Sequence, residues 1–569
     1  MGLHKQYLKV GQSAKNRLFG VPPPFKKTPA AAGAQDSTSP IQMLISERGR
    51  VNHGRLAVIL VGLFTLAMGI ILSSIPWADY LILKNLRLWN GTISYRYWQK
   101  PGVIRLTKLY IFNVTNPDGF LNNGEKPKLL EVGPFVYRED MEKVNIKFHD
   151  NGTVTFQHKK ILQFVPELSA DPNAKVTVPN IPLLTLTSKS TQLNRLVQIT
   201  LSLWLRNYKP FVTITPEELL FGYDDTLVSI ANAFFPVHLR PKEQMGLLLG
   251  RNGTLNEVST IFTGHTSMKD FGLLDRLNGL DHLPYWSEPP CNDIRASEGS
   301  FFPPRDFTHD DVVQVYDKDL CRVLPLEFQS MTEKDGIRAG YYRPPDNVFE
   351  LPEKNPGNKC YCPGSKCKCP PRGLQNISPC QFAAPVYLSF PHFYNADPAL
   401  LEAVEGLLPS KEQHETYFKI QPKLGVPLEG KVKVQLNLKV DRAINIYSVT
   451  NFRDIIFPII WLEEGVSELT PSIRRLVYIA TTLAETAVPI INYTCIVVGS
   501  LMLTVTFVRA YKNVVFTRET LERGKKTLRR GSSFIINGQH RLLIIRDSYT
   551  LLNNISSEPD PDPDPEPDV

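Results

Sequence analysis

The chain has 569 residues, of which 42% are hydrophobic and 21% are charged, and its formal net charge is +8. That length exceeds the roughly 250–300 residues at which one hydrophobic core stops growing, so more than one kind of segment is predicted. Residues 76–486 hold 45 Lys/Arg and 45 Asp/Glu, which leaves the excess positive charge at the two ends. A neutral central segment argues against a nucleic-acid-binding protein, because such a protein needs a basic surface.

Residues 1–55 form the first segment and are predicted to be a disordered N-terminal tail. The stretch 21–40 (VPPPFKKTPAAAGAQDSTSP) is rich in Pro, Ala and Ser, a composition that does not build a packed core. The tail holds 9 Lys/Arg against 2 Asp/Glu, so it is strongly basic.

Residues 56–75 (LAVILVGLFTLAMGIILSSI) are twenty residues without a charge. As a helix, this run is long enough to cross the ~30 Å hydrocarbon core of a bilayer. The alternative is a cleaved secretory signal, whose apolar run is only about 7–15 residues and follows a short basic lead. Because 55 residues precede this run and no small-residue cleavage site follows it, an uncleaved transmembrane helix is predicted.

Residues 76–486 form the largest segment, and their clearest local patterns are those of strands. Alternating apolar residues at 144–156 flank Asp150-Asn151-Gly152 and predict a β-hairpin. Residues 431–440 (KVKVQLNLKV) alternate polar and apolar throughout and predict a half-buried strand. Helical spacing predicts helices at 193–204 and, after Pro216, at 217–223. The segment is therefore predicted to be α+β, an antiparallel sheet core with inserted helices.

Five Asn-x-Ser/Thr sequons lie in this segment and indicate a glycosylated location outside the cytoplasm. Two further matches, at Asn492 and Asn554, are discounted because they fall in a predicted span and in the C-terminal tail. The predicted glycosylation sites are Asn90, Asn113, Asn151, Asn252 and Asn376.

Seven of the eight cysteines lie between residues 291 and 380, and the eighth is Cys495. In a cytosolic protein, the spacing of the run 360–369 (CYCPGSKCKC) would indicate zinc. On the outside of a secretory-pathway protein, disulfides are favoured. Because seven is odd, one thiol is left over.

Residues 487–508 (AVPIINYTCIVVGSLMLTVTFV) are a second uncharged run and predict a second transmembrane helix. Two spans place both termini on one side of the membrane. Residues 509–569 hold 10 Lys/Arg, eight of them at 509–530, so the positive-inside rule predicts that both tails are cytoplasmic. Attraction of these basic residues to anionic lipid then accounts for the net charge.

The C-terminal tail, 509–569, carries a predicted sorting signal. Two overlapping patterns, acidic-dileucine and Tyr-x-x-apolar, are formed by Asp547, Tyr549, Leu551 and Leu552. Such signals place two apolar side chains in a pocket of a clathrin adaptor, which predicts endosome or lysosome membranes besides the cell membrane. The alternative is a chance match beside the apolar stretch 542–545.

A second tail motif, 529–532 (RRGS), resembles a basic-directed kinase site at Ser532. A phosphate there would add about −1.5 to −2 charges and loosen the tail from anionic lipid.

The sequence contains no catalytic motif of the P-loop, G-x-S-x-G or H-E-x-x-H type, and its 11 histidines show no i, i+4 pairing. An ecto-nucleotidase has a similar two-span layout but needs Gly-rich phosphate loops with paired acids. A trimeric two-span channel needs polar residues in its spans, for which Thr504 and Thr506 are slight support. No enzyme activity, cofactor or metal is predicted.

Several motifs, in this order along the chain, resemble the class B scavenger receptor family. They are 133–139 (GPFVYRE), 209–211 (KPF), 218–225 (ELLFGYDD), 291–304 (CNDIRASEGSFFPP), 360–362 (CYC), 391–394 (PHFY) and 458–462 (PIIWL). The resemblance covers roughly residues 55–510, both spans included, and neither tail.

The resemblance implies an ectodomain with an antiparallel β-barrel-like core, a helical bundle at its membrane-distal apex, and a hydrophobic tunnel toward the bilayer. Ligands of the family dock at the apex, where the predicted helices around 193–223 would lie. Arg195, Arg206 and Lys209 are then candidates to bind anionic head groups or lipoprotein surfaces, and only Lys209 lies inside a matching motif. The alternative is a solvated basic helix face.

The resemblance also implies three disulfides, Cys291–Cys360, Cys321–Cys380 and Cys362–Cys369. Cys369 is preferred over Cys367 because the Pro-Pro-Arg-Gly that follows it resembles the family context. Cys367 is then unpaired or forms an intermolecular bond. Neither tail has a cysteine, so the tail palmitoylation of some relatives is not expected.

Together these features predict a scavenger-receptor-type membrane protein with lipid ligands such as fatty acids, sterols and lipoprotein lipid. It would capture them at the apex and pass them passively through the tunnel toward the bilayer, without a cofactor. The alternative is a lysosomal or endosomal membrane protein that sorts a protein cargo. Homo-oligomerisation is left open.

Overall fold

The computed structural model describes residues 53–229, 244–306, 308–362, 369–381 and 383–515, together with residues 522, 533–536 and 539–542. The chain divides into two compact units, each described here by itself. One unit consists of Met1–Met68 and Cys495–Val569, and the other of Gly69–Thr494.

Two described helices are long and apolar enough to cross a membrane. The first is α1 (His53–Ser74), which begins inside the predicted N-terminal tail. The second is the helical run Pro471–Asn513. It comprises α11 (Pro471–Tyr478), a π-helical turn (Ile479–Leu483) and most of α12 (Ala484–Val515).

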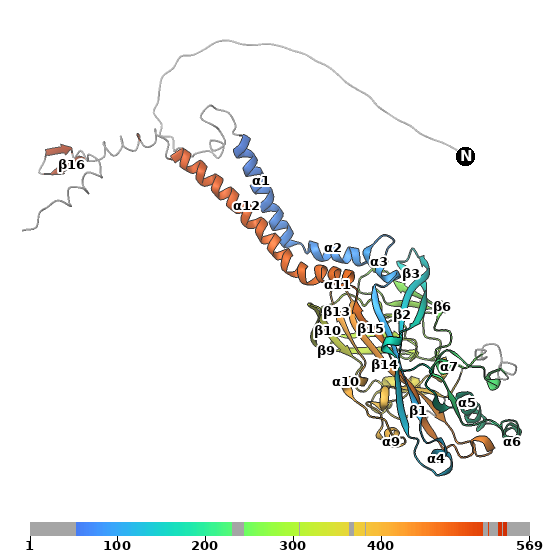
Figure 1. The fold of residues 1–569 in the computed structure, drawn as a ribbon. Coiled ribbons are helices and arrows are strands. Elements are labelled where there is room, and N and C mark those ends of the chain that lie inside the picture. Colours follow the sequence, from blue (N-terminus) through green and yellow to red (C-terminus); the bar gives the residue numbers. More distant parts are fainter. Residues whose placement is uncertain are drawn as a thin grey trace, which may run out of the picture. The chain divides into compact units, whose positions relative to one another are not determined.

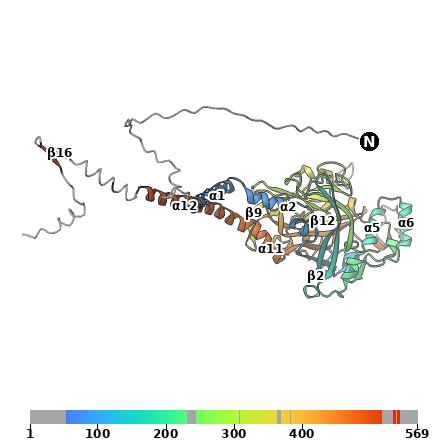
Figure 2. The same ribbon diagram turned by 90° about the horizontal axis from the view of Figure 1, so that it is seen from above.

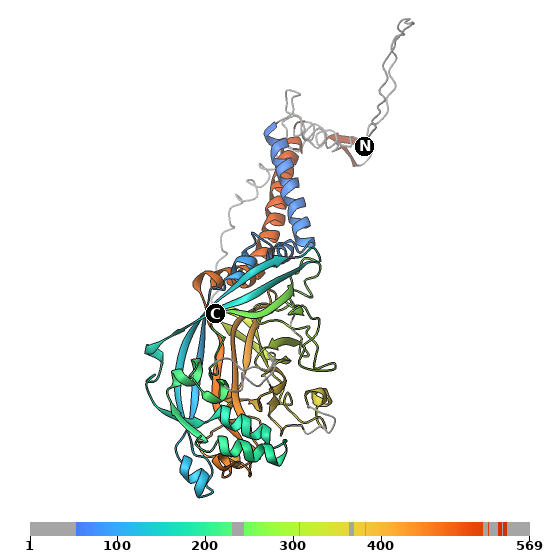
Figure 3. The same ribbon diagram turned by 90° about the vertical axis from the view of Figure 1, so that its right-hand side faces the viewer.

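Within the smaller unit, α1 and α12 pack side by side at two glycines (Figures 1 and 3). A Cβ added at Gly499 would lie 2.6 Å from the backbone nitrogen of Leu66, and one added at Gly62 would lie 3.1 Å from Leu503 Cδ2. Small residues allow helix backbones to approach closely in a bilayer, so these glycines set the crossing. The described part of the C-terminal tail also contains an antiparallel pair, β16 (Ser533–Ile536) and β17 (Gln539–Leu542).

The larger unit is built on a 13-stranded sheet whose neighbouring strands pair antiparallel. The main path runs β7-β6-β3-β2-β1-β15-β14-β13-β10-β9-β8, with β12 on β14 and β11 on β12. The strands are β1 (Val103–Val114), β2 (Leu129–Phe148), β3 (Thr153–Phe164), β6 (Gly253–Phe262), β7 (Leu274–Leu277), β8 (Val312–Asp317), β9 (Arg322–Lys334), β10 (Ile337–Arg343), β11 (Gln375–Asn376), β12 (Val386–Ser389), β13 (Tyr417–Gln421), β14 (Val426–Val440) and β15 (Ile455–Leu469). The predicted hairpin at 144–156 is the β2–β3 pair.

The strand ladder of the described residues does not close into a barrel, since β7 and β8 stand at its two ends. The structure therefore shows a large antiparallel sheet rather than a closed barrel. Ser297 links the two ends by isolated bridges, antiparallel to Leu273 beside β7 and parallel to Val315 of β8.

Short helices of this unit gather at two opposite ends of the sheet (Figures 1 and 2). One end carries α2 (Trp77–Leu86), α3 (Ile93–Gln99) and α11. The other carries α5 (Ile181–Ser190), α6 (Arg195–Trp204) and α7 (Pro216–Phe221), with the two-stranded sheet β4 (Val176–Pro179) and β5 (Phe211–Ile214). The remaining helices are α4 (Pro117–Asn122), α9 (Pro398–Glu402) and α10 (Lys411–His414). Helices were predicted where α6 and α7 lie, and a Thr215–Glu218 capping box with Pro216 explains the start of α7.

Separate apolar clusters form the core of the unit. The largest joins α5 and α7 to β1, β2, β14 and β15, through side chains such as Phe112, Leu183 and Phe457. A second cluster joins α2 and α3 to β3 and β6, through side chains such as Leu86, Trp98 and Phe156. The helices at both ends of the sheet are thus anchored in the sheet.

The prediction that the strand at 431–440 is half buried is wrong, because its polar face is buried as well. On β14, Lys433, Gln435 and Asn437 are at most 3% exposed. The segment between β12 and β13 covers this face: the His392 N–H donates to Gln435 Oε1 (2.7 Å), and Lys433 Nζ donates to the Gln413 carbonyl (2.6 Å). Alternation identifies a strand but does not show whether later chain covers its polar face.

Candidate functional site

Helix α6 exposes an apolar stripe at the end of the sheet opposite α2 and α11. Leu196 and Leu203 are 73% and 74% exposed, and Ile199 between them is also exposed. These residues are three and four positions apart and therefore share one helix face. Large side chains exposed in a contiguous row mark an interaction surface more often than isolated ones do.

The opposite face of α6 is held by polar contacts. Gln198 is buried, donates to the Leu193 carbonyl (2.9 Å) and accepts from Asn445 Nδ2 (2.6 Å). One turn later, Ser202 Oγ accepts the Tyr447 N–H (2.9 Å). These bonds fix the orientation of α6, so its apolar side faces solvent.

The loop that holds α6 adds apolar side chains of its own. Ile444 and Tyr447 are both exposed, and Tyr447 is hydrogen-bonded through its backbone to α6. We define the α6 surface as Leu196, Ile199, Leu203, Ile444 and Tyr447. The sequence predicted the helix but not the loop residues, which lie more than 240 residues later and show no local pattern.

The three predicted basic residues lie at the start of α6 and in the segment that follows it. Arg195 is the first residue of α6, Arg206 follows its end, and Lys209 precedes β5. All three are exposed, and none forms an ion pair within the described residues. A cation in the first turn opposes the helix dipole, so the charge of Arg195 does not serve helix stability.

Buried charges lie on the strands at the centre of the sheet. Lys160 Nζ on β3 lies 2.9 Å from carboxylate oxygens of both Glu139 on β2 and Glu464 on β15. Arg105 on β1 lies 3.5 Å from Glu139 and 3.6 Å from Glu464. Although burial raises the pKa of Glu464, the surrounding cations, Lys160 first among them, hold it well below its usual range. We call these four residues the Lys160 network.

A second buried ion pair continues this polar interior. Lys143 is fully buried, and its Nζ lies 3.3 Å from Glu298 and donates to Ser300 Oγ (2.7 Å). His158 Nε2 lies 3.4 Å from the other oxygen of Glu298. Burial alone would raise the pKa of Glu298, but Lys143 and His158 outweigh it and lower that pKa.

A cavity of about 300 Å³ reaches the edge of the Lys160 network. Arg105 and Glu139 line it together with Lys100, Met141 and Lys159. Its lining mixes both charge signs with apolar groups, so it differs from the apolar tunnel lining that the resemblance implies.

Two stacked histidines occupy the buried polar face of β14. The rings of His392 and His414 lie 4.4 Å apart and nearly parallel, at 7°. His392 Nε2 donates to Glu131 (2.6 Å), which also accepts from Trp461 Nε1 (2.7 Å). His414 Nδ1 accepts the Ser410 N–H (3.0 Å). Burial, with the neighbouring His392, lowers the pKa of His414 to about 4.

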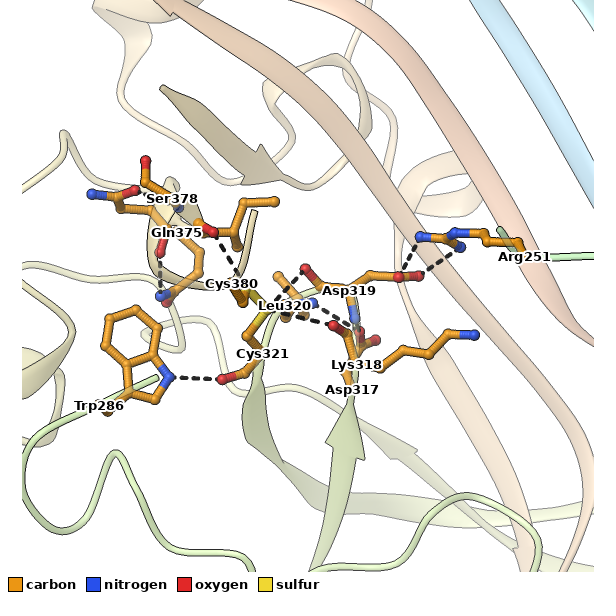
Figure 4. Close-up of a disulfide and its surroundings, with 12 residues drawn as sticks. Arg251, Trp286, Asp317, Lys318, Asp319, Leu320, Cys321, Gln375, Ser378 and Cys380 are labelled. Atoms are coloured by element: carbon orange, nitrogen blue, oxygen red, sulfur yellow. Dashed lines mark hydrogen bonds and ion pairs between the residues drawn. A yellow bond between two sulfur atoms is a disulfide. The ribbon is translucent and has the colours of Figure 1, made fainter. Parts of the chain in front are cut away.

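The structure joins the cysteines in the three pairs that the resemblance implies: Cys291–Cys360, Cys321–Cys380 and Cys362–Cys369. Figure 4 shows the Cys321–Cys380 bond, with Trp286 Nε1 donating to the Cys321 carbonyl (2.7 Å). Cys367 lies outside the described residues, and Cys495 is a free thiol.

The turn before Cys321 carries further charged groups, which are half-buried (Figure 4). Arg251 forms an ion pair with Asp319. Burial, with the nearby Asp319 charge, raises the pKa of Asp317 to about 6. Burial lowers the pKa of Lys318 to about 8.

The predicted glycosylation sites differ in accessibility. Asn90, Asn151 and Asn252 are exposed, and Asn113 on β1 is half-buried. Asn376 is 6% exposed, and its Oδ1 accepts the Ser378 N–H (2.9 Å). Asn376 is therefore the least accessible of the five predicted sites.

The tail sites lie outside the described residues. They are the sorting residues Asp547, Tyr549, Leu551 and Leu552 and the phosphorylation site Ser532.

Comparison with known proteins gives one family and two groups of relatives. The CD36 family model matches residues 59–510. The chain is 33% identical over 410 residues to Scavenger receptor class B member 1 of Mus musculus, covering 71% of this chain and 79% of the relative. It is 34% identical over 421 residues to Lysosome membrane protein 2 of Mus musculus (73% and 85%) and 35% identical over 419 residues to that of Homo sapiens (73% and 85%).

Proposed function

The chain belongs to the CD36 family, and from this premise we propose that it captures lipid or lipoprotein ligands at the α6 surface. It is a scavenger-receptor-type membrane protein. The proposed ligands are particles or membranes that expose acyl chains, sterols and anionic head groups. In this proposal the protein acts as a receptor, without catalysis.

The observation that carries the proposal is the exposed stripe of α6 beside unpaired cations. Apolar side chains next to basic residues are typical of helices that bind lipid interfaces, where the apolar face enters the acyl boundary and the cations meet phosphate. Leu203 has the largest exposed fraction in the stripe, so it would lose the most contact with water on binding.

The test compares Leu203→Glu with a matched control, Leu408→Glu. Both leucines are exposed to a similar extent, 74% and 78%, but Leu203 lies on α6 and Leu408 in the loop between α9 and α10. Full-length protein in nanodiscs is titrated with anionic phospholipid vesicles and with lipoprotein particles. Leu203→Glu is expected to weaken binding by at least about tenfold, because burial of a leucine contributes about 1.5–3 kcal/mol. Equal binding by the two variants would contradict the proposal.

We infer further that the sheet forms a barrel-like core and that captured lipid moves inside it toward the bilayer. The bridges of Ser297 between the two ends of the ladder and the apolar cluster around Phe112 support this route. The Lys160 network lies on strands that contribute to the same cluster.

Sorting of a protein cargo is the second candidate. It is favoured by the similarity to Lysosome membrane protein 2 and by the tail motif with Leu551 and Leu552. The α6 surface would then dock an apolar protein face. Mass spectrometry of lipids and proteins that copurify with the full-length chain separates the two candidates, since a stoichiometric protein without lipid favours cargo sorting.

We propose residence at the cell membrane and in endosomes or lysosomes, with two spans, cytoplasmic tails and glycans on Asn90, Asn113, Asn151 and Asn252. The similarity to one receptor and one lysosome membrane protein supports both locations. Binding of a clathrin adaptor to the C-terminal tail and homo-oligomerisation remain part of this proposal.

A further inference from the structure

Arg322, the first residue of β9, carries a buried positive charge. The residue is 5% exposed. Its Nη1 donates to Gln375 Oε1 (2.8 Å) and to the Val348 carbonyl (3.4 Å), and its Nη2 donates to Asn358 Oδ1 (3.3 Å). Its Nε–H has no partner within the described residues. The acceptors that it does reach are all neutral.

No carboxylate of the described residues lies within 4 Å of this guanidinium. Two half-buried guanidinium groups differ, since Arg251 pairs with Asp319 and Arg105 pairs with Glu139. Where those arginines have a carboxylate partner, Arg322 has the aromatic ring of Tyr361, whose centroid lies 3.9 Å from Cζ. An aromatic face offsets only part of the cost of burying a cation, so the charge remains incompletely compensated.

A small pocket of about 20 Å³ lies beside Arg322. It has room for one particle the size of a water molecule or a monoatomic ion. Asn376 lines it too, and the Asn376 Nδ2 donates no hydrogen bond within the described residues. Glu350 also lines the pocket, but its carboxylate accepts the Leu351 N–H (3.1 Å) and lies 3.8 Å from Lys354.

The three disulfides hold this pocket rigid. Cys321, bonded to Cys380, directly precedes Arg322. Tyr361 lies between Cys360 and Cys362, each bonded to a different partner. The donors and the aromatic wall are therefore fixed before any ligand arrives, which lowers the entropic cost of binding.

We propose that this pocket binds one small monovalent anion of the chloride type. The anion supplies the counter-charge that the described protein groups do not provide to Arg322, and it accepts hydrogen bonds from N–H donors. The pocket volume admits a monoatomic ion. The site is independent of lipid capture at the α6 surface.

The test uses the full-length chain in detergent micelles at constant ionic strength, with chloride replaced stepwise by gluconate, a much bulkier anion. The unfolding temperature is expected to rise with chloride and to saturate, by about 1–3 °C, as for a ligand that binds only the folded state. Bromide is expected to replace chloride and to give an anomalous diffraction peak beside Arg322.

Arg322→Met keeps the length of the side chain but removes the charge, so the difference between chloride and gluconate should vanish. In the control variant Arg295→Met, which alters an exposed arginine, the difference in unfolding temperature between chloride and gluconate should persist. The bromide peak decides the matter if Arg322→Met does not fold. An unfolding temperature of the unmodified chain that does not depend on chloride, or a pocket that holds only water, would overturn the proposal.

Discussion

At the scale of single residues, the burial of His414 against the His392 ring makes the fold sensitive to pH. Each Nδ1 accepts a backbone N–H, from Leu408 and Ser410 respectively (3.0 Å each). An imidazole can accept only while that nitrogen is unprotonated. The folded state therefore requires the Nδ1 of His414 to be free of a proton.

The pKa of His414, lowered from 6.5 to about 4 by burial and by His392, predicts a loss of stability in acid. Between pH 6.5 and about 4 the unfolded chain binds a proton at this residue and the folded chain does not, so the contribution of His414 falls as the pH falls. His414→Asn keeps an acceptor for the Ser410 N–H but does not titrate. The variant should lose less unfolding temperature than the unmodified chain between pH 7 and pH 5.

Other groups that titrate in the same pH range are present in both the unmodified chain and the His414→Asn variant. Their effects therefore cancel when the two unfolding temperatures are compared. Asp317, whose pKa is raised to about 6, acts with the opposite sign, and it is present in both chains. An equal fall of the unfolding temperature in both chains would show that His414 does not contribute.

Predictions about single residues from the sequence agree with the structure where the residues lie in motifs that resemble those of the family. The cysteine pairs follow from the resemblance, and the structure contains the same pairs. Asn376 fits the sequon as well as Asn151 does, yet only Asn151 is exposed, because burial depends on chain packed from elsewhere. The pairing of His392 with His414, 22 positions apart, leaves no local pattern at all.

At the scale of elements, periodicity predicted α6, α7 and β14, but it did not predict what covers them. Val197 and Leu201 are four positions apart and share a helix face, yet Val197 is exposed and Leu201 packs against the core. Both faces of β14 are buried because the connection from β12 to β13 returns over its polar side. The periodicity of apolar residues predicts which side chains share a face of a helix or strand. Whether that face is exposed depends on segments that are distant in the sequence.

The crossing of α1 and α12 yields a prediction at this scale. Gly499→Leu is expected to separate the two spans, since even a Cβ at this position would lie 2.6 Å from the Leu66 nitrogen. With Cys495→Ser as background, Gly62→Cys and Leu503→Cys provide a cross-link across the helix pair. Gly499→Leu should lower the cross-linking yield severalfold in membranes.

Val497→Leu is the matched control, because Val497 is 63% exposed on the same helix. It should leave the cross-linking yield unchanged. An unchanged yield in Gly499→Leu as well would mean that Gly499 does not set the distance between the spans.

At the scale of the whole molecule, charge explains how a neutral segment is organised. Residues 76–486 balance 45 basic with 45 acidic residues, and part of this balance lies inside the protein, in the Lys160 network and in the pair of Lys143 with Glu298. The count was available from the sequence, but the internal pairing was not, since it joins strands more than 300 residues apart.

The central claim is that lipid meets this receptor at the α6 surface. It is tested most directly by placing a photo-crosslinking amino acid at Leu203 or, as control, at Leu408, in the full-length chain in membranes. After exposure to lipoprotein particles or anionic vesicles and illumination, the cross-linked products are identified by mass spectrometry. The account predicts phospholipid or sterol adducts at position 203 and few at position 408. Equal lipid adducts at the two positions, or protein adducts alone at position 203, would contradict it.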